Sequence, residues 1–479
     1  MAKARSIYCC TACGAQQPRW LGRCPGCGAW ESLVEEQVAG TGPAAAAPRD
    51  LLSPASAAGP GPAATLTSVV KGASAIPLRA IDMDAAPRVA TGLEELDRVL
   101  GGGLVPGSVT LLGGEPGIGK STLCLQLAAA IASTGDPLLY VTGEESLEQV
   151  RLRAARLGPV PAPLLALAET RVEALGAPWR EAAPRAVLID SIQTMQTERV
   201  ESAPGSVAQV RESAALLSAT AKANGTALVL VGHVTKEGTL AGPRVLEHLV
   251  DVVLSFEGDR GHAFRMLRAT KNRYGSTHEV GVFTMGDAGL LAVENPSELF
   301  LAERHTGAPG SCIVPTMEGS RPMLIEVQSL LAPAGYGTAR RTCLGIDDQR
   351  VALLLAVLDR RTPVDVLSQD VYVNVTGGVR VAETAADLAV ALAMVSSRLD
   401  LPIPADVAAC GEIGLGGEVR RVARIEQRLR EAARLGFRRV LVPAASAGRV
   451  GEAEAIGVAS VADAVEWLRK AVNGPVNNS

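Results

Sequence analysis

The octapeptide Gly-Glu-Pro-Gly-Ile-Gly-Lys-Ser at residues 114–121 restricts the fold more than any other feature of this chain. It follows the apolar run 109–113 and opens a helical pattern that continues to residue 133. A strand, a glycine-rich loop and a helix in this order form the context in which the pattern GxxxxGK[ST] binds phosphates. The sequence therefore predicts a parallel α/β sheet with an ATP site at the end of one strand.

Each residue type in this loop has a physical role in the predicted site. Glycines let backbone N–H groups surround the phosphates, and the N-terminus of the following helix adds positive potential. Lys120 is expected to contact the β- and γ-phosphate oxygens, and Ser121 to ligate Mg²⁺. Asp190 ends the apolar run 187–189 and is expected to hold the same ion. The complete predicted ATP site comprises Gly114, Glu115, Pro116, Gly117, Ile118, Gly119, Lys120, Ser121, Thr122, Asp190 and His233.

Short apolar runs and helical patterns alternate over most of residues 88–295. The near-continuous apolar runs are 109–112, 138–141, 187–189 and 227–231, and the helical patterns are 119–133, 146–157 and 206–223. Continuous apolar runs are typical of strands buried on both faces of a parallel sheet. We therefore expect a doubly wound α/β domain with helices on both faces, followed by a second α/β segment after residue 295.

Two acidic residues, Glu144 and Glu145, follow the run 138–141, whose strand should lie beside the P-loop strand. A carboxylate in that place can orient and deprotonate the attacking water, and Glu144 is the candidate. The alternative is that both acids stand in the first turn of the next helix, where negative charge is favourable. From the residues alone, these two alternatives are equally supported.

Two further segments carry polar residues after predicted strands. His233 follows the run 227–231, where it can sense the γ-phosphate, although a lone histidine more often has no such role. The segment Lys271-Asn272-Arg273-Tyr274-Gly275 is a cationic cluster beyond the sheet, and the usual reading of such a cluster is a solvated basic turn.

Four of the nine cysteines form two Cys-x2-Cys pairs near the N-terminus, Cys10 with Cys13 and Cys24 with Cys27. Each pair can hold one edge of a tetrahedral Zn²⁺, and four thiolates leave no open position, so the metal should be structural. A redox dithiol or free thiols are the alternative. Cys9 adjoins Cys10, and a swap of the ligand between them stays open.

Composition sets the organisation of the chain and limits its partners. The expected parts are a zinc knuckle at 1–32, an Ala-, Pro- and Gly-rich flexible linker at 33–75, an ATPase domain at 76–295 and a second α/β domain at 296–479. A net charge of −4 and 3% aromatic residues predict that any nucleic-acid contact uses phosphates and local basic loops. No apolar run is long enough for a membrane span, and no signal peptide is evident, so a cytoplasmic protein is expected.

The chain resembles the bacterial RadA/Sms family of DNA-repair proteins in four motifs taken together. These are the knuckle with Trp20 and Trp30, the sequence GEPGIGKST, the segment VTGEES and the pentapeptide KNRYG. The resemblance implies a RecA-type core in a hexameric ring that moves on single-stranded DNA and acts on branched intermediates with the RecA recombinase. It gives Glu144 the water-activating role and His233 the sensor role. It makes Lys271 and Arg273 cations supplied to a neighbouring subunit. Expected DNA contacts are Arg199, Lys236 and Arg244.

The C-terminal segment is similar to the Lon protease domain, whose catalytic dyad is a serine and a lysine. The serine position falls at Ala385 and the lysine position at Glu426, so the resemblance implies a domain without protease activity. Arg420, Arg421, Arg424 and Arg428 are expected to form one basic face, unless the helix that carries them is simply solvated. An ATP-dependent protease and a KaiC-like regulatory ATPase that does not move on DNA are the rival functions.

Overall fold

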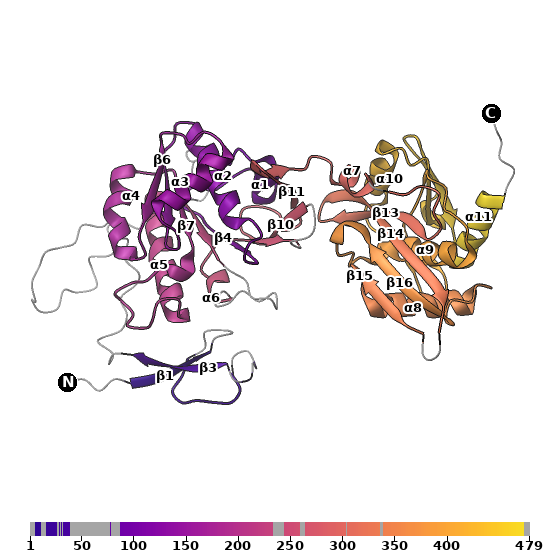
Figure 1. Cartoon of the computed structure of the whole chain (residues 1–479), viewed down its shortest axis with the longest axis horizontal. Helices are drawn as coiled ribbons and strands as arrows, with labels where there is room; N and C mark the ends of the chain where they lie inside the picture. The colour runs from indigo at the N-terminus through magenta and orange to yellow at the C-terminus, as the bar shows by residue number, and fades with distance from the viewer. Residues whose placement is uncertain are drawn as a thin grey trace, which may run out of the picture. The chain divides into compact units, whose positions relative to one another are not determined.

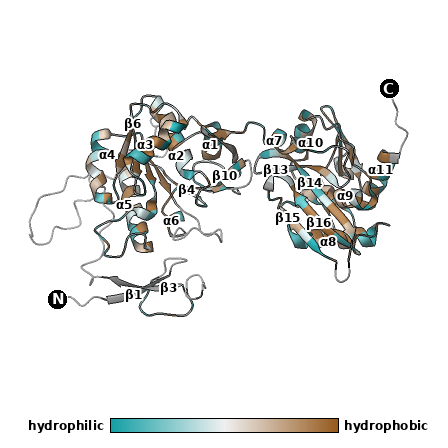
Figure 2. Cartoon of the chain, in the orientation of Figure 1, coloured by the Kyte–Doolittle hydropathy of each residue, from teal (hydrophilic) through white to brown (hydrophobic). Residues whose placement is uncertain are grey.

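The computed structural model describes residues 5–10, 16–25, 28, 30, 32–38, 77, 87–232, 244–258, 264–302, 304–335 and 339–473 (Figure 1). The chain divides into two compact units, one made of residues 1–260 and 264–292 and the other of residues 261–263 and 293–479. Hydrophobic residues concentrate on the strands inside each unit (Figure 2). No helix in the described part of the chain is long and apolar enough to cross a membrane.

The N-terminal knuckle is a small antiparallel sheet of three strands in the order β2-β1-β3. Its strands are β1 (Arg5–Cys10), β2 (Gln16–Gln17) and β3 (Leu33–Val38). All six residues of β3 pair with β1, so the knuckle extends to Val38, beyond the predicted start of the linker at residue 33. The remaining linker residues predicted at 39–75 lie outside the described residues.

The ATPase core is a sheet of nine strands in the order β12-β11-β10-β9-β4-β8-β7-β5-β6. The six strands from β9 to β6 are parallel, as the apolar runs predict, and β10 to β12 extend the sheet antiparallel. The strands are β4 (Val109–Gly114), β5 (Leu138–Thr142), β6 (Leu164–Ala168), β7 (Ala186–Asp190), β8 (Ala227–Val231), β9 (Val252–Glu257), β10 (Phe264–Asn272), β11 (Val280–Gly286) and β12 (Gly289–Ala292).

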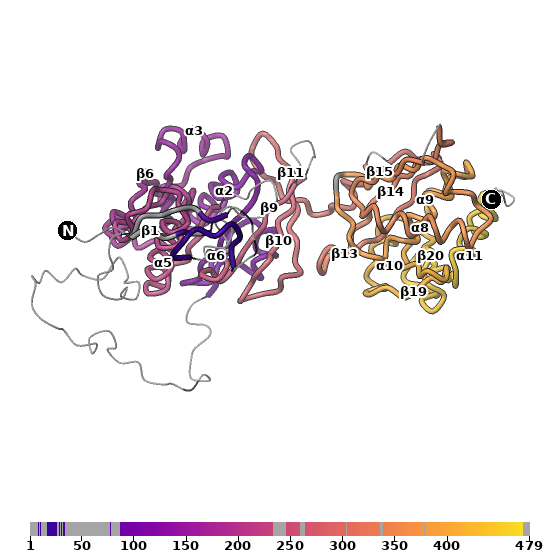
Figure 3. Tube along the Cα trace, turned by 90° about the horizontal axis from the view of Figure 1, so that it is seen from below, coloured from indigo at the N-terminus to yellow at the C-terminus, as the bar shows by residue number. Residues whose placement is uncertain are grey.

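Helices cover both faces of this sheet and form two separate cores, which confirms the predicted doubly wound fold (Figure 3). One core takes side chains from α1 (Glu94–Leu100), α2 (Lys120–Ser133) and α3 (Leu147–Leu157). The opposite core takes them from α4 (Gly176–Ala182), α5 (Val207–Asn224) and α6 (Arg244–Glu247). Every residue of β4, β5, β7 and β8 is buried, because each of these strands has helices on both sides.

The C-terminal unit is a mixed sheet of eight strands in the order β15-β16-β14-β13-β17-β20-β22-β21. Its strands are β13 (Ser311–Glu318), β14 (Arg321–Pro333), β15 (Arg341–Leu344), β16 (Gln369–Val375), β17 (Val407–Ala409), β20 (Arg439–Pro443), β21 (Gly448–Val450) and β22 (Ala453–Val458). A separate hairpin joins β18 (Glu412–Ile413) to β19 (Val419–Arg420). The helices are α7 (Pro296–Leu301), α8 (Asp348–Arg361), α9 (Asp387–Leu399), α10 (Ile425–Arg434) and α11 (Val461–Asn473).

Candidate nucleotide-binding site

The predicted phosphate loop joins the buried strand β4 to helix α2. Gly119 is the N-cap of α2 and has a φ of 117°, in the left-handed region that favours glycine. A Cβ atom on Gly114 would lie 2.7 Å from the carbonyl oxygen of Phe256, so this position also excludes a side chain. The loop therefore presents backbone N–H groups at the start of a fourteen-residue helix, which is the geometry of a phosphate site.

Lys120 lies inside the loop and is 4% exposed. Its Nζ donates hydrogen bonds to the carbonyl oxygens of Gly114 (2.8 Å) and Glu115 (2.9 Å). Burial lowers the pKa of Lys120, and the negative charges of Asp190 and Glu144 partly offset this shift. A buried ammonium held by neutral carbonyls is suited to anionic phosphate oxygens, which form stronger, charge-assisted hydrogen bonds. The residues of the loop thus fit ATP.

Asp190 is the last residue of β7 and is 6% exposed. The hydroxyl group of Tyr140, on the adjacent strand β5, donates a hydrogen bond of 2.5 Å to its Oδ2. This contact fixes the carboxylate at the edge of the sheet where β4 ends. Ser121 and Thr122 occupy the first turn of α2. Carboxylate and hydroxyl oxygens are ligands that Mg²⁺ accepts alongside phosphate, so these residues fit a bound magnesium ion.

Glu144 and Glu145 differ in their surroundings. Glu144 accepts a hydrogen bond of 2.5 Å from Ser191 Oγ, next to Asp190, whereas Glu145 forms an ion pair with Arg153. The helix α3 begins at Leu147, after both acids, and its N-cap is Ser146 in a capping box. The alternative that both acids stand in the first turn of the next helix is therefore wrong. Glu144 lies close to Lys120 and Asp190.

The hairpin formed by β11 and β12 also borders the phosphate loop, and no motif predicts this contact. Gln126 of α2 exchanges two hydrogen bonds of 2.9 Å with the backbone of Leu290. A Cβ atom on Gly119 would lie 2.9 Å from Cε of Met285, a side chain that is 41% exposed. The hairpin thus places an exposed thioether beside the loop. The turn-forming segment Gly-Asp-Ala-Gly at 286–289 was the available signal for the hairpin itself.

The cationic pentapeptide lies at the opposite edge of the sheet from the phosphate loop of its own chain. The backbone of Arg273 bonds to Asp251, and Asp251 in turn bonds to Val109 at the start of β4. Gly114 follows Val109 by five residues, a separation of roughly 17 Å at the usual strand rise. The structure therefore does not bring Lys271 and Arg273 together with Lys120 and Glu144 in one chain.

The pentapeptide 271–275 forms more side-chain contacts with the rest of the domain than a solvated basic turn would form. Lys271 Nζ donates to the carbonyl oxygens of Glu247 (2.6 Å), the last residue of α6, and of Val250 (2.7 Å), just after it. Burial, followed by the nearby charge of Arg273, lowers the pKa of Lys271. Arg273 Nη1 lies 3.0 Å from Oδ1 of the buried Asp251, yet its side chain is 56% exposed. One guanidinium nitrogen of Arg273 is thus held by Asp251, while more than half of the side chain stays exposed.

The predicted DNA contacts are only partly described. Arg199 lies 3.7 Å from Glu212 in an ion pair and is 38% exposed. Its loop is fixed by the buried Gln209, whose Nε2 donates to the carbonyl oxygens of Val200 (2.6 Å) and Ser202 (3.1 Å). His233 and Lys236 lie outside the described residues, as does the side chain of Arg244, the first residue of α6.

Two of the four predicted zinc ligands, Cys10 and Cys24, lie within the described residues. Both are buried in one small cluster with Leu33. The backbone N–H of Gly28 donates to the carbonyl oxygen of Cys24 at 2.8 Å, which folds the second Cys-x2-Cys turn tightly. Cys13 and Cys27 lie outside the described residues. Two buried thiols in one small core fit one ligand position each of a tetrahedral zinc site.

In the C-terminal unit, the positions expected to match the Lon dyad hold Ala385, which is buried, and Glu426, which is exposed and paired with Arg430. The prediction that Arg428 shares one basic face with Arg420, Arg421 and Arg424 is wrong. Arg428 is 2% exposed, and its two Nη atoms lie 2.7 and 2.6 Å from the carboxylate of Glu383. The helix α10 turns this arginine inward, against the carbonyl oxygen of Pro315.

Comparison with known proteins divides the chain into three recognisable regions. A family described as AAA domain matches residues 75–239, and one described as rubredoxin metal binding domain matches residues 8–35. Residues 348–446 match a family described as subunit ChlI of Mg-chelatase.

Full-length relatives resemble the whole chain. The DNA repair protein RadA of Bacillus subtilis is 48% identical over 475 residues, which cover 99% of this chain and 100% of the relative. The DNA repair protein RadA of Pseudomonas aeruginosa is 50% identical over 470 residues, with 98% and 100% coverage. The protein of the same name from Listeria monocytogenes is 46% identical over 474 residues, again with 98% and 100% coverage.

Proposed function

The chain belongs to the RadA family of DNA repair proteins, and from this premise we propose that it is a ring-forming motor that moves along single-stranded DNA. Its AAA-type domain makes it an ATPase of DNA repair. The finer proposal adds DNA-stimulated ATP hydrolysis, branch migration at recombination intermediates and joint action with the RecA recombinase.

The observation that supports the ring proposal is the distance between the phosphate loop and the segment that carries Lys271 and Arg273. Arg273 lies roughly 17 Å along the sheet from the phosphate loop of its own chain, and its side chain is half exposed although one guanidinium nitrogen pairs with Asp251. A cation in this place reaches a phosphate only if another subunit presents one. This supports a ring, which we propose to be hexameric, in which Lys271 and Arg273 complete the site of a neighbour.

Within one subunit, we assign the chemistry to residues around the phosphate loop. Lys120 balances the charge of the β- and γ-phosphates, and Ser121 and Asp190 hold Mg²⁺. Glu144 orients the attacking water and accepts its proton, with Ser191 as the neighbour that positions its carboxylate. Arg273 and Lys271 of an adjacent subunit stabilise the charge that develops during hydrolysis, and the carbonyl oxygens of Glu247 and Val250 hold the Lys271 ammonium in place.

DNA binding is assigned to three basic residues of the ATPase domain. Arg199, Lys236 and Arg244 are the proposed phosphate contacts, and His233 is the proposed sensor of the γ-phosphate. Cys10, Cys13, Cys24 and Cys27 hold a structural Zn²⁺. The C-terminal unit serves as a scaffold, since Ala385 and Glu426 supply neither the nucleophile nor the base of a Ser–Lys protease.

The test is the ATPase rate of the purified full-length chain with and without single-stranded DNA. The proposal predicts a saturable increase in the rate, which Lys120→Ala abolishes. A KaiC-like regulatory ATPase would hydrolyse ATP at the same rate in both conditions, and an ATP-dependent protease would degrade casein. Either of those results would contradict the proposal.

A further inference from the structure

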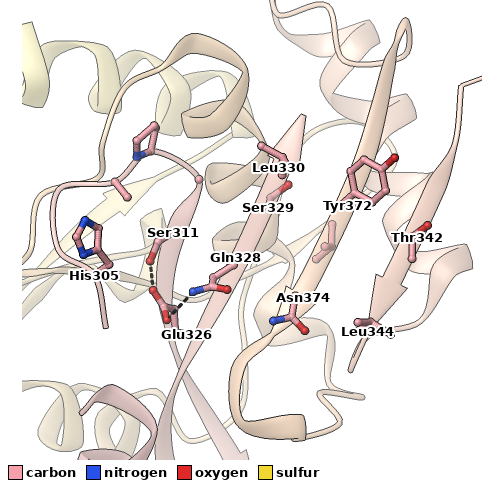
Figure 4. A pocket seen from close by; sticks show the side chains of 14 residues that line it. His305, Ser311, Glu326, Gln328, Ser329, Leu330, Thr342, Leu344, Tyr372 and Asn374 are labelled. Carbon is pink, nitrogen blue, oxygen red and sulfur yellow. Dashed lines mark hydrogen bonds between the residues drawn. The ribbon is translucent and has the colours of Figure 1, made fainter. Parts of the chain in front are cut away.

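A pocket of about 370 Å³ opens on the sheet of the C-terminal unit, and neither Ala385 nor Glu426 lines it (Figure 4). Three strands form its floor, β14, β16 and β15, and the loop before β13 forms one wall. The residues of the floor stand opposite one another in register: Gln328 pairs with Asn374, and Leu330 pairs with Tyr372. Leu330 is 61% exposed, so this part of the sheet is open to solvent.

The wall of the pocket is fixed to its floor. The backbone N–H of Ser329 donates to the carbonyl oxygen of Gly310 at 2.7 Å, and that of Gly310 donates to Ser396 Oγ at 2.8 Å. Gly310 has a φ of 91°, and a Cβ atom there would lie 2.2 Å from the carbonyl oxygen of Ser329. Only glycine permits this approach, so the pocket is formed before any ligand arrives.

The main chemical feature of the pocket is the carboxylate of Glu326, which is 3% exposed. It accepts hydrogen bonds from Ser311 Oγ and from Gln328 Nε2, the latter at 3.1 Å (Figure 4). Among the described residues no cation forms an ion pair with it. The nearby Arg304 stacks on the ring of Phe437 and donates to the carbonyl oxygen of Ala405 instead. A buried carboxylate is normally paired with a positive charge.

The rest of the lining indicates which kind of cation fits. The side-chain amides of Gln328 and Asn374 and the hydroxyl group of Thr342 offer neutral acceptors on the same face. The ring of Tyr372 provides an aromatic surface, and Leu330 and Leu344 provide apolar contact for an alkyl stem. A guanidinium group is planar, carries five donors and stacks on aromatic rings, whereas an ammonium group is compact and strongly hydrated.

We propose that this pocket binds the guanidinium group of an arginine side chain presented by another polypeptide. Glu326 supplies the opposite charge at the floor, Gln328 and Asn374 supply further acceptors, and Tyr372, which stands opposite Leu330, lines the path of the arginine stem. The pocket then acts as an attachment point for a partner of the C-terminal unit. It does not depend on ATP hydrolysis, because none of its residues belongs to the nucleotide site.

The proposal is tested by isothermal titration calorimetry on the full-length chain. The probes are N-acetyl-arginine amide, agmatine and N-acetyl-citrulline amide, the last a neutral isostere of the first. Capped arginine should bind saturably and at least about tenfold more tightly than capped citrulline, because a charge-assisted hydrogen bond is lost. Tighter binding of capped arginine than of agmatine supports a polypeptide as the source. Equal binding of capped arginine and agmatine would overturn the claim that a polypeptide supplies the guanidinium group, and would leave a small guanidine as the ligand.

Two variants connect the binding to the pocket. Glu326→Gln should weaken the binding of capped arginine at least about tenfold, since it removes the charge and keeps the shape. Glu466→Gln is the matched control, because Glu466 is an exposed acid of the same unit paired with Lys470, and it should have no effect. The proposal fails if capped arginine does not bind the wild-type chain, or if it binds the Glu326→Gln variant equally well. The citrulline comparison requires no variant and holds even if Glu326→Gln does not fold.

Discussion

Glu144 and Glu145 are neighbours in the sequence with separate partners, and this difference can be tested. Glu144→Gln should slow ATP hydrolysis by at least about 10²-fold, because the group that accepts the proton of the attacking water is lost. Nucleotide binding should persist, since Lys120 and the loop are intact. Glu145→Gln is the matched control, as it loses only its ion pair with Arg153. Stopped-flow measurement of hydrolysis and fluorescent-ATP binding separate the two effects; equal rates for both variants would remove Glu144 from the mechanism.

The inward turn of Arg428 leads to a prediction about stability. Arg428→Met leaves Glu383 without its cation and should destabilise the C-terminal unit by about 3–5 kcal/mol, the usual cost of breaking a buried pair. Arg430→Met, two residues along the same helix, removes an exposed pair with Glu426 and should cost less than about 1 kcal/mol. Hydrogen exchange of the peptides from α10 measures the loss of stability in both variants. Similar protection in the two would contradict the burial argument.

At the scale of elements, the sequence pattern predicts the ATPase domain well because its central strands are uniformly apolar. The strands β4, β5, β7 and β8 and the helices α2, α3 and α5 all lie within a few residues of the predicted runs. The strand β6 was missed because it lies at the edge of the sheet and is half exposed, so its pattern carries little signal. The strand β3 was assigned to the linker because its pairing with β1 is not visible in its own composition.

The site was predictable where it depends on one segment and unpredictable where it depends on tertiary pairing. The phosphate loop and Asp190 follow from a motif and a strand end. The contacts of Tyr140 with Asp190, of Ser191 with Glu144 and of Arg273 with Asp251 join residues 22 to 50 positions apart. No local pattern encodes such distances, and neither does the inward direction of Arg428.

The knuckle provides a prediction at the same scale. Cys24→Ser should release zinc and unfold only residues 5–38, because Cys24 and Cys10 form most of that small core. Cys343→Ser, in the C-terminal unit, is the control and should keep the metal. Metal analysis by mass spectrometry and the melting profile of the chain are the measurements. If the wild-type chain contains no zinc, or if Cys24→Ser unfolds the ATPase domain as well, the account of a separate knuckle is incorrect.

At the scale of the whole molecule, the position of Arg273 predicts that activity belongs to the assembly. Arg273→Ala should slow hydrolysis by up to about 10³-fold, the scale of a finger-type arginine, while ATP binding is kept. Lys222→Ala is the matched control, because Lys222 lies 3.8 Å from the same carboxylate of Asp251 and should leave the rate near that of the wild type. In mixtures with the wild-type chain, the ATPase activity should fall more steeply than in proportion to the fraction of Arg273→Ala chains. A linear fall, with a normal rate for the pure variant, would leave Arg273 a surface residue.

The central claim is movement along single-stranded DNA driven by ATP, and the most direct measurement is displacement of streptavidin from biotin at one end of a DNA strand. We predict that the full-length chain removes streptavidin in the presence of ATP, faster from one end than from the other. Lys120→Ala and Arg273→Ala should remove none. Displacement that requires no hydrolysis, or DNA-stimulated hydrolysis without any displacement from either end, would contradict the account.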